Sequence, residues 1–127
     1  MKAREFDRDG EVYKQMQGNI TCKEVKALGR KVQNFDGEKW HIMSRFYMRD
    51  ALALKFEGSE ELKELLLSTG DAVLAEASPF DTLWGIGYGE NNLKAYDPSQ
   101  WRGTNVLVNM LMYLRDEIRE GEALLDE

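Results

Sequence analysis

One short segment of the chain combines residue types that suit a nucleotide-like ligand. It runs from Glu76 to Gly87 and places the carboxylate of Asp81 three residues before the indole of Trp84. Gly85 and Gly87 follow, and glycine lets a backbone bend or approach a ligand closely. An acid, a flat aromatic face and free backbone amides suit a ribose joined to a phosphate and a base. A polar loop with a half-buried tryptophan is the alternative, since a lone glycine-rich loop is weak evidence.

Each of these residues has a binding interpretation and a structural one. Asp81 could stabilise an oxocarbenium-like state or orient a water, or it could cap the following turn. Trp84 could stack on a base or pack under the loop. Glu76 could touch ribose hydroxyls, although holding the loop by hydrogen bonds is the role we favour. The amides of Gly85 and Gly87 could face a diphosphate, and the same glycines could serve the turn geometry.

Two polar residues precede the last apolar stretch of the chain. Asn105 and Thr104 compete as the N-cap of a helix there, because both side chains can accept a bond from a free amide. The start of that helix could also face an anion. Asn105 is therefore a candidate ligand-binding residue as well as a candidate cap.

The composition is that of an acidic globular protein of 127 residues, for which we expect one domain over residues 1–127. The net charge of −6 disfavours broad affinity for nucleic acid. The single cysteine, Cys22, and a start without a signal peptide favour a cytoplasmic location. No apolar run approaches a membrane span, and no Cys, His, Asp or Glu cluster has metal-ligand spacing. Neither a membrane nor a metal is expected.

Periodicity and capping residues predict a mainly α fold with one or two short strands and a long ordered loop. Helices are expected over residues 3–17, 21–29, 37–56, 60–68 and 103–119, with a strand over residues 72–77 and the loop over residues 78–102. The expected capping residues are Thr21 with Glu24, Asp36 and Ser59, and the expected stops are Gly70 and Gly121. Trp40, Met43, Tyr47, Ala51 and Leu54 form the expected buried stripe of the long helix, and Phe46, Leu52 and Phe56 are expected to widen it.

The order of several motifs resembles that of the NADAR (NAD and ADP-ribose) superfamily, also called YbiA-like. The resemblance covers nearly the whole chain. It rests on Leu28-Gly29-Arg30, on Trp40, on Met48 to Phe56, on Leu62 to Asp71, on Ser78 to Gly87, and on Gly103-Thr104-Asn105 followed by Leu111 to Arg115.

This resemblance implies a compact helical YbiA-like fold and the hydrolysis of an N-glycosidic bond, without metal or cofactor. The implied substrates are a riboflavin-pathway ribosylamine phosphate or ADP-ribosyl-guanine in nucleic acid. Asp81 would lie near the anomeric carbon with Trp84 stacked beside it. Arg30 would hold phosphate together with the glycines, and Trp40 would border the pocket.

The chain departs from the family at its beginning. Family members usually start with a Ser-Asn-Phe element, a strand pair and a helix that carries Glu-His-Tyr-Phe-Gln, whereas Met1 to Phe6 resembles the residues directly after that helix. The glutamate of the missing helix is thought to take part in catalysis. Two alternatives to an enzyme therefore stay open. One is a non-catalytic module that binds ADP-ribose or a related nucleotide, and the other is a subunit completed by self-association or by a second chain.

Overall fold

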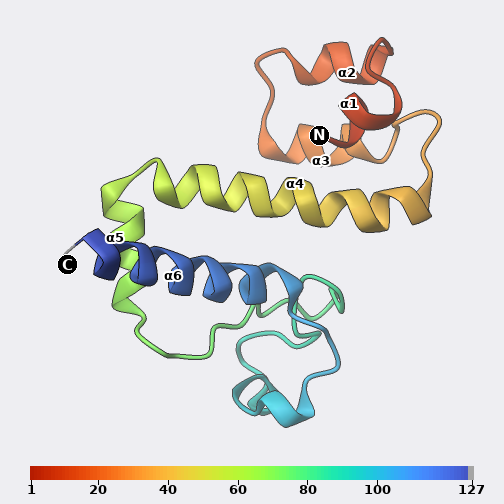
Figure 1. Ribbon diagram of the computed structural model, residues 1–127. Helices are drawn as coiled ribbons and strands as arrows, with labels where there is room; N and C mark the ends of the chain where they lie inside the picture. The colour runs from red at the N-terminus through yellow and green to blue at the C-terminus, as the bar shows by residue number, and fades with distance from the viewer. Residues whose placement is uncertain (126–127) are drawn as a thin grey trace. The chain divides into compact units, whose positions relative to one another are not determined.

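The computed structural model describes residues 1–125, and its regular elements are all helical (Figure 1). The predicted mainly α fold is confirmed. The contacts within the chain fall into two compact units, an N-terminal unit over residues 1–48 and a C-terminal unit from residue 49 onward. One domain over residues 1–127 stays a prediction. None of the helices in residues 1–125 has the length and apolar character needed to cross a membrane.

The N-terminal unit contains three short helices and the first part of a long one. They are α1 (Lys2–Phe6), α2 (Glu11–Met16), α3 (Cys22–Gly29) and α4 (Gly37–Glu57). The capping box of α3 is confirmed, because the Thr21 hydroxyl accepts from the Glu24 amide at 3.3 Å and the Thr21 amide donates to the Glu24 carboxylate at 2.7 Å. Asp36 caps α4 as predicted, accepting from the amides of Glu38 and Lys39.

The single helix predicted over residues 3–17 is wrong, since a turn separates α1 from α2. The amide of Gly10 donates to the carbonyl of Asp7 at 3.2 Å, and Gly10 then forms the N-cap of α2. A β-carbon at Gly10 would lie 1.9 Å from the Asp7 carboxylate. Gly10 therefore allows the Asp7 side chain to lie against the backbone, and this closes the turn.

Aromatic side chains and one ion pair hold the start of α4 within its own unit. The ring of Trp40 lies 6.1 Å from that of Phe6 and 5.9 Å from that of Tyr47. The carboxylate of Glu5 pairs with Lys39 at 2.9 Å and accepts a short hydrogen bond from the Tyr47 hydroxyl. These bonds, the one from Lys39 first and then the one from Tyr47, hold the pKa of Glu5 below its ordinary value of 4.5.

This pKa shift predicts a pH-dependent contribution to stability. A carboxyl group whose folded pKa is depressed stabilises the fold above its unfolded pKa, and this contribution is lost as the pH falls through the folded pKa. We expect Glu5→Gln to be less stable than the parent at neutral pH and the difference to shrink below about pH 4. Urea unfolding of Glu5→Gln and of the parent across this pH range measures the difference in stability. Glu38→Gln, which removes an exposed acid nearby, serves as the control, and a pH-independent difference for Glu5→Gln would contradict the assignment.

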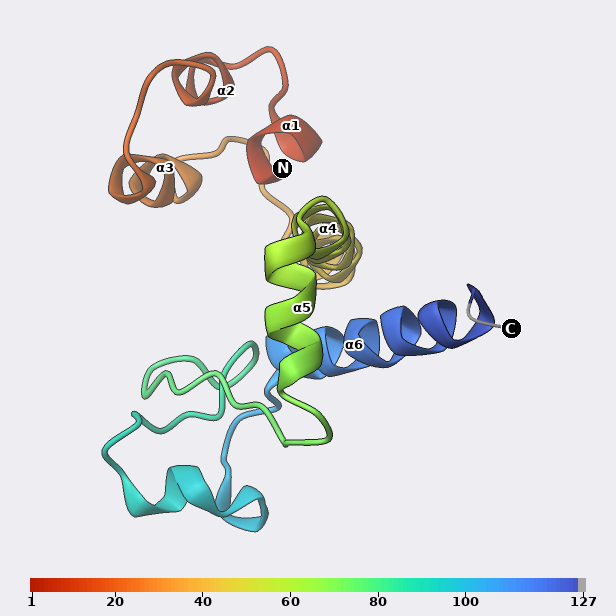
Figure 2. The same cartoon turned by 90° about the vertical axis from the view of Figure 1, so that its left-hand side faces the viewer.

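The C-terminal unit is built around α5 (Glu60–Ser68) and α6 (Val106–Leu125), which pack across each other (Figures 1 and 2). Leu66, Leu114 and Ile118 form its buried centre, and the partly buried side chains packed on them include Leu52, Phe56 and Leu111. The predicted stripe of α4 is wrong at Leu54, which is 77% exposed, and at Phe46, which is 59% exposed. Leu52 and Phe56 are confirmed, since they pack on this core together with Ala53.

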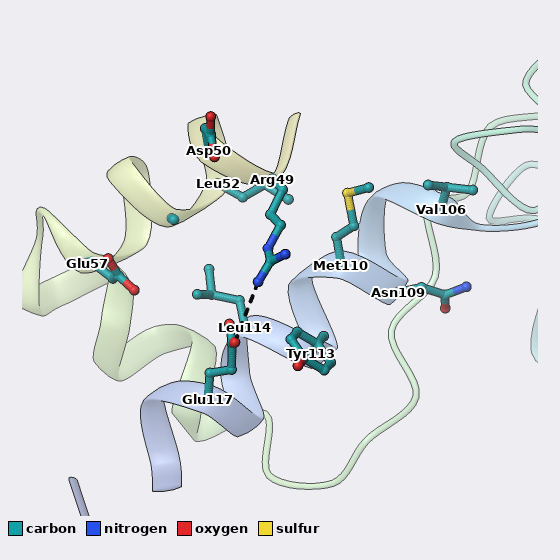
Figure 3. A pocket seen from close by; sticks show the side chains of 11 residues that line it. Arg49, Asp50, Leu52, Glu57, Val106, Asn109, Met110, Tyr113, Leu114 and Glu117 are labelled. Carbon is teal, nitrogen blue, oxygen red and sulfur yellow. Dashed lines mark ion pairs between the residues drawn. The ribbon is translucent and has the colours of Figure 1, made fainter. Parts of the chain in front are cut away.

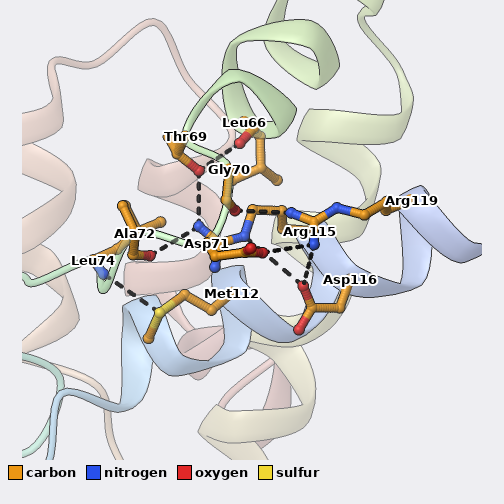
Figure 4. A network of polar contacts seen from close by, with 10 residues as sticks. All are labelled: Leu66, Thr69, Gly70, Asp71, Ala72, Leu74, Met112, Arg115, Asp116 and Arg119. Atoms are coloured by element: carbon orange, nitrogen blue, oxygen red, sulfur yellow. Dashed lines mark hydrogen bonds and ion pairs between the residues drawn. The ribbon is translucent and has the colours of Figure 1, made fainter.

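The ends of α5 are confirmed, and its C-terminal end is fastened to α6. Ser59 caps its start, and Gly70 follows its end with a φ of +58°. Two arginines of α6 reach the turn after α5, as Figure 4 shows. Arg115, only 4% exposed, donates to the hydroxyl of Thr69 at 2.8 Å and to the carbonyl of Ala72 at 3.0 Å. Arg119 donates to the carbonyl of Gly70 at 2.8 Å.

The last helix differs from its prediction at both ends. It begins at Val106 instead of Gly103, because the residues before it bond to a distant loop. It also continues to Leu125, through Gly121, where the sequence predicts a stop. A glycine ends a helix when it takes a positive φ, as Gly70 does and Gly121 does not. The last two residues of the acidic C-terminus, 126 and 127, lie outside the described part.

The strand predicted over residues 72–77 is not formed within residues 1–125. The segment from Ala72 to Ser78 has no regular secondary structure, and no neighbouring strand pairs with it. Its inner bonds go to a side chain: the amide of Glu76 donates to Oδ1 of Asn105, and the carbonyl of Leu74 accepts from Nδ2 of Asn105, both at 2.9 Å. The Asn105 side chain takes the place of a neighbouring strand, and the amide of Ser78 bonds to the carbonyl of Glu76 at 2.9 Å, which closes a tight turn at Ala77.

Candidate functional site

The predicted loop is closed by backbone hydrogen bonds between its two ends. It contains two short 3₁₀ turns, η1 (Leu93–Tyr96) and η2 (Pro98–Gln100). The amide of Ile86 donates to the carbonyl of Glu76 at 3.0 Å, and the amide of Gly103 donates to the carbonyl of Ile86 at 2.9 Å. Residues far apart in the sequence are thereby tied together, so the part of the loop around Asp81 is ordered.

The start of α6 bonds to this loop. The amides of Thr104, Asn105, Val106 and Leu107 donate to the carbonyls of residues 82, 85, 83 and 84, over distances from 2.8 to 3.2 Å. These are the amides that a helix N-terminus offers to an anion or a cap. Because loop carbonyls already occupy them, the structure gives no support to the interpretation in which this helix start faces an anion.

Asp81 forms the turn that leads into Trp84. Its Oδ1 accepts from the amide of Leu83 at 3.0 Å and from the amide of Trp84 at 2.8 Å. The capping role that the sequence left open is therefore present. The other oxygen, Oδ2, makes no hydrogen bond within residues 1–125, and the side chain is half-buried. Oδ1 therefore stabilises the turn, and Oδ2 is free to contact a ligand.

Trp84 ends this turn, and Glu76 precedes it in the sequence. Trp84 is half-buried, its carbonyl accepts from Leu107, and its indole N–H makes no hydrogen bond within the described residues. Glu76 holds the loop through its backbone, since its carbonyl accepts from the amides of Ser78 and Ile86. The Glu76 carboxylate makes no hydrogen bond or ion pair in residues 1–125. It is the backbone of Glu76, not its side chain, that carries the loop-holding role.

The glycines of the motif serve close approach and an unusual backbone conformation. A β-carbon at Gly85 would lie 2.8 Å from the carbonyl of Glu76 and 3.0 Å from that of Asp81. Gly87 has a φ of +77°, which glycine adopts at little cost. The amides of both glycines make no hydrogen bond within residues 1–125. Turn geometry is thus present. Both glycines are buried, so contact of their amides with a diphosphate stays a prediction.

Asn105 joins the elements of this loop. It is 1% exposed, has a φ of +56°, and uses both polar atoms of its side chain on the segment around Leu74 and Glu76. Neither Asn105 nor Thr104 places its side chain on the first amides of α6 among the described hydrogen bonds. The predicted capping role is wrong, because Asn105 spans the loop instead.

Arg102 was missed by the sequence analysis, and Gly103 was placed only in the family motif and at the start of the last helix. Arg102 donates to the carbonyl of Gly87 at 2.6 Å and to that of Pro79 at 3.2 Å, and its guanidinium lies 4.6 Å from the centre of the Tyr88 ring. Gly103 lies directly against the backbone of Gly85, because a β-carbon at Gly103 would lie 2.1 Å from the carbonyl of Gly85. No local pattern reveals either role, since their partners are 14 or more residues away.

This close contact predicts a large effect of a small substitution. Gly103→Ala should lower the free energy of unfolding by about 3 kcal/mol, because backbone atoms must move to admit the methyl group. Gly121→Ala is the matched control: a β-carbon at Gly121 would meet nothing within 4 Å, and alanine favours the helix by up to about 1 kcal/mol. Urea unfolding gives the stability of both variants. Equal stability of Gly103→Ala and Gly121→Ala would show that Gly103 does not lie against the carbonyl of Gly85.

The remaining two candidate residues belong to the N-terminal unit and are described within it. Arg30 follows α3, is exposed, and makes no ion pair within residues 1–125. Trp40 is half-buried between Phe6 and Tyr47, as its core interpretation required. The structure therefore brings together Glu76, Asp81, Trp84, Gly85, Gly87 and Asn105 in the C-terminal unit, and places Arg30 and Trp40 in the other.

A separate cavity of about 550 Å³ lies between the last residues of α4 and α6 (Figure 3). Three carboxylates line it, from Asp50, Glu57 and Glu117, and Arg49 points at Glu117 over 3.7 Å. None of the candidate residues lines this cavity. Because its acids outnumber its single cation, it suits a phosphate-bearing ligand poorly. We therefore keep the candidate site at the loop.

Comparison with known proteins agrees with the family resemblance noted in the sequence. A family model described as the NADAR domain matches residues 1–119. N-glycosidase R617 of Acanthamoeba polyphaga mimivirus is 36% identical over 102 residues, which are 80% of this chain and 59% of that protein. N-glycosidase Npun_R5314 of Nostoc punctiforme is 32% identical over 112 residues, covering 88% and 65% of the two chains. N-glycosidase YbiA of Escherichia coli is 31% identical over 109 residues, covering 85% and 61%.

The chain thus spans less than two thirds of the length of each of these relatives. The match nevertheless extends over the whole candidate loop and the start of α6. The family model covers most of the chain, and the relatives exceed 30% identity. The chain belongs to the NADAR family.

Proposed function

We propose that this chain carries part of an N-glycosidase site that hydrolyses the bond between a ribose and a base. The proposal rests on the two carboxylate oxygens of Asp81. Oδ1 accepts hydrogen bonds from the amides of Leu83 and Trp84, whereas Oδ2 has no hydrogen-bond partner in residues 1–125. A carboxylate held in this way is preorganised for a cationic centre. The relatives named N-glycosidase support the same reaction class.

The chemistry needs few groups. As the C–N bond breaks, its electron pair leaves with the base, and positive charge develops on the anomeric carbon and the ring oxygen. The Asp81 carboxylate stabilises that charge, water attacks the carbon, and one water proton passes to solvent or to the departing base. Trp84 would stack on the base or ribose, and the free amides of Gly85 and Gly87 would face phosphate oxygens.

The proposed substrate is a ribosylated or ADP-ribosylated base, either ADP-ribosyl-guanine in nucleic acid or a ribosylamine phosphate of the riboflavin pathway. Arg30 and Trp40 stay proposed ligand residues, as phosphate contact and pocket border. Asn105 would act indirectly, because both of its side-chain atoms already hold the loop. We therefore propose Asn105 as a positioning residue, with Glu76 held by it.

One assay tests the proposal. The purified chain is incubated with DNA that carries ADP-ribosyl-guanine and, separately, with the ribosylaminopyrimidine phosphate, and released ADP-ribose or ribose phosphate is quantified by chromatography. We expect release from one of the two substrates at a rate above the protein-free control. If folded protein releases neither product, the N-glycosidase proposal fails for this chain.

A second candidate function is a module that binds ADP-ribose without turnover. The two hydrogen bonds that Asp81 accepts favour this function, because they give Asp81 a structural role that needs no catalysis. Calorimetric titration with ADP-ribose separates the two functions. Binding without release supports the module, whereas absence of both leaves only a subunit that needs a second chain.

A further inference from the structure

Two cations and one aromatic ring come together on the loop that carries Asp81. The guanidinium carbon of Arg102 lies 4.6 Å from the centre of the Tyr88 ring, and Nζ of Lys94 lies 5.8 Å from the same centre. Both cations are close enough to the ring for a cation–π contact. We call Tyr88, Lys94 and Arg102 the Tyr88 cluster, and its two positive charges share a single ring.

Neither cation of the Tyr88 cluster has an acidic partner within residues 1–125. Elsewhere in the C-terminal unit, ion pairs with carboxylates hold Arg49, Lys63, Arg115 and Arg119. Two unpaired like charges beside one ring repel each other, and an anion close to both would remove that repulsion. The cluster is therefore a local centre of positive charge on a protein whose net charge is −6.

The acidic residues between Tyr88 and Arg102 do not neutralise this charge. Both carboxylate oxygens of Asp97 accept hydrogen bonds from the residues that directly follow it. Glu90 lines an apolar groove of the same loop and makes no ion pair within residues 1–125. The positive charge of the cluster is thus left for a ligand.

Arg102 is held in one orientation by the loop itself. Its Nε donates to the carbonyl of Gly87 at 2.6 Å, and its Nη2 donates to the carbonyl of Pro79 at 3.2 Å. Its Nη1 makes no hydrogen bond within residues 1–125, and the side chain is exposed. A guanidinium fixed in this way can donate to an anion with little further loss of side-chain entropy.

The cluster adjoins the turn of Asp81 and a run of free peptide groups. Pro79, whose carbonyl Arg102 binds, lies two residues before Asp81 in the sequence. The amides of residues 88–91 make no hydrogen bond within residues 1–125, and these residues are half-buried or exposed. Successive free amides are a recurrent feature of loops that bind anions.

We propose that Lys94 and Arg102 bind a phosphate group of the ligand. This inference rests on the proposed function for the identity of that ligand, and it adds a phosphate contact within the C-terminal unit. The guanidinium would donate from Nη1, and the ammonium would supply the second positive charge. The same phosphate oxygens occur in a free nucleotide such as ADP-ribose and in the backbone of a nucleic acid.

Titration of the isotope-labelled chain, followed by nuclear magnetic resonance, tests the proposal. The probes are inorganic diphosphate, ADP-ribose, and adenosine, which lacks phosphate. We expect diphosphate and ADP-ribose to shift the amide signals of residues 88–91 and the Nε signal of Arg102, and adenosine to leave these signals unchanged. Absence of a shift with diphosphate at millimolar concentration, or an equal shift with adenosine, would overturn the proposal.

Lys94→Gln tests the charge without disturbing the loop, because Nζ of Lys94 makes no hydrogen bond within residues 1–125. We expect it to raise the dissociation constant for diphosphate about fivefold, and Lys94→Arg to restore the affinity. Lys55→Gln is the matched control, since Lys55 is exposed and its Nζ lies 5.6 Å from the centre of the Phe56 ring. Equal losses in Lys94→Gln and Lys55→Gln would show attraction by net charge alone and would also overturn the proposal.

A single-stranded DNA oligonucleotide without ADP-ribose distinguishes the two sources of phosphate. Shifts of the same signals by the oligonucleotide, weakened in Lys94→Gln, would identify the nucleic-acid backbone, whereas shifts by ADP-ribose alone would identify the free nucleotide. Both results support the phosphate site. Binding is measured without turnover, so a chain that hydrolyses its substrate but does not bind diphosphate at this cluster would overturn this inference alone. Diphosphate binding without hydrolysis would leave the inference standing and remove the N-glycosidase proposal.

Discussion

Replacing Asp81 by asparagine is expected to reduce N-glycosidic hydrolysis by about 10²–10⁴-fold while leaving the protein folded. Asparagine keeps an oxygen that can accept from the amides of Leu83 and Trp84, as Oδ1 of Asp81 does at 3.0 and 2.8 Å. It removes the negative charge that would face the anomeric carbon. The substitution therefore separates the catalytic role of the residue from its role in the turn.

The loop supplies a matched control for this experiment. Asp97 also caps a turn, since its Oδ1 accepts from the amide of Ser99 at 3.0 Å, and it is not among the candidate site residues. Asp97→Asn should leave the rate of hydrolysis close to that of the parent. Initial rates are measured with the substrate that the parent cleaves, and circular dichroism verifies folding. Equal rates for Asp81→Asn and the parent would remove Asp81 from the mechanism.

If the chain only binds its ligand, the same variant gives a different result. The affinity for ADP-ribose would then be measured by calorimetry, and Asp81→Asn would change it little, because the turn that carries Trp84 is kept. The two functions therefore differ in the response to a single change of charge.

The ends of α3, α4 and α5 that are set by local contacts were predictable. Thr21, Asp36 and Ser59 each accept from an amide two or three residues further along, and such bonds depend only on the sequence nearby. Gly70 ends its helix through its own positive φ. The turn at Asp81 could be expected as an alternative for the same reason, since its partners are the amides two and three residues further along.

Several errors arose where distant residues decide the conformation. The start of α6 is set by carbonyls of residues 82–85, about twenty residues away, and the spacing of residues 103–106 contains no sign of them. The strand predicted over residues 72–77 is not formed, because pairing requires a neighbour that periodicity cannot supply. Leu54 fits the helical stripe by spacing, yet the core lies on the side of Leu52 and Phe56.

The candidate site shows the same limit. Residue types and short spacing identified Asp81, Trp84 and the glycines as one segment, and the structure shows how that segment is held. The residues that hold it, Arg102 and Asn105, act on partners 15 to 31 residues away. A single sequence contains no pattern for such contacts. The ligand roles assigned to the site residues stay predictions until binding and turnover are measured.

Asn105→Ala is expected to cause the largest loss of stability, at least about 3 kcal/mol in the free energy of unfolding. Asn105 is 1% exposed, and its removal leaves the amide of Glu76 and the carbonyl of Leu74 without their partners. Each such group costs about 1–3 kcal/mol when it is buried and unpaired. Alanine also tolerates the φ of +56° poorly, at a cost of about 1–2 kcal/mol.

Asn105→Gly separates these two contributions. Glycine accepts the positive φ but provides no amide side chain, so we expect it to be about 1 kcal/mol more stable than Asn105→Ala and still well below the parent. Urea unfolding gives both differences. Hydrogen exchange at Ile86, whose amide donates to the carbonyl of Glu76, reports whether the loop opens locally. If Asn105→Gly matched the parent in stability and in exchange, the hydrogen bonds of Asn105 would contribute nothing, and the loop around Asp81 would be held by its backbone contacts alone. Faster exchange with reduced turnover would instead show that Asn105 positions the catalytic loop from outside the reacting atoms.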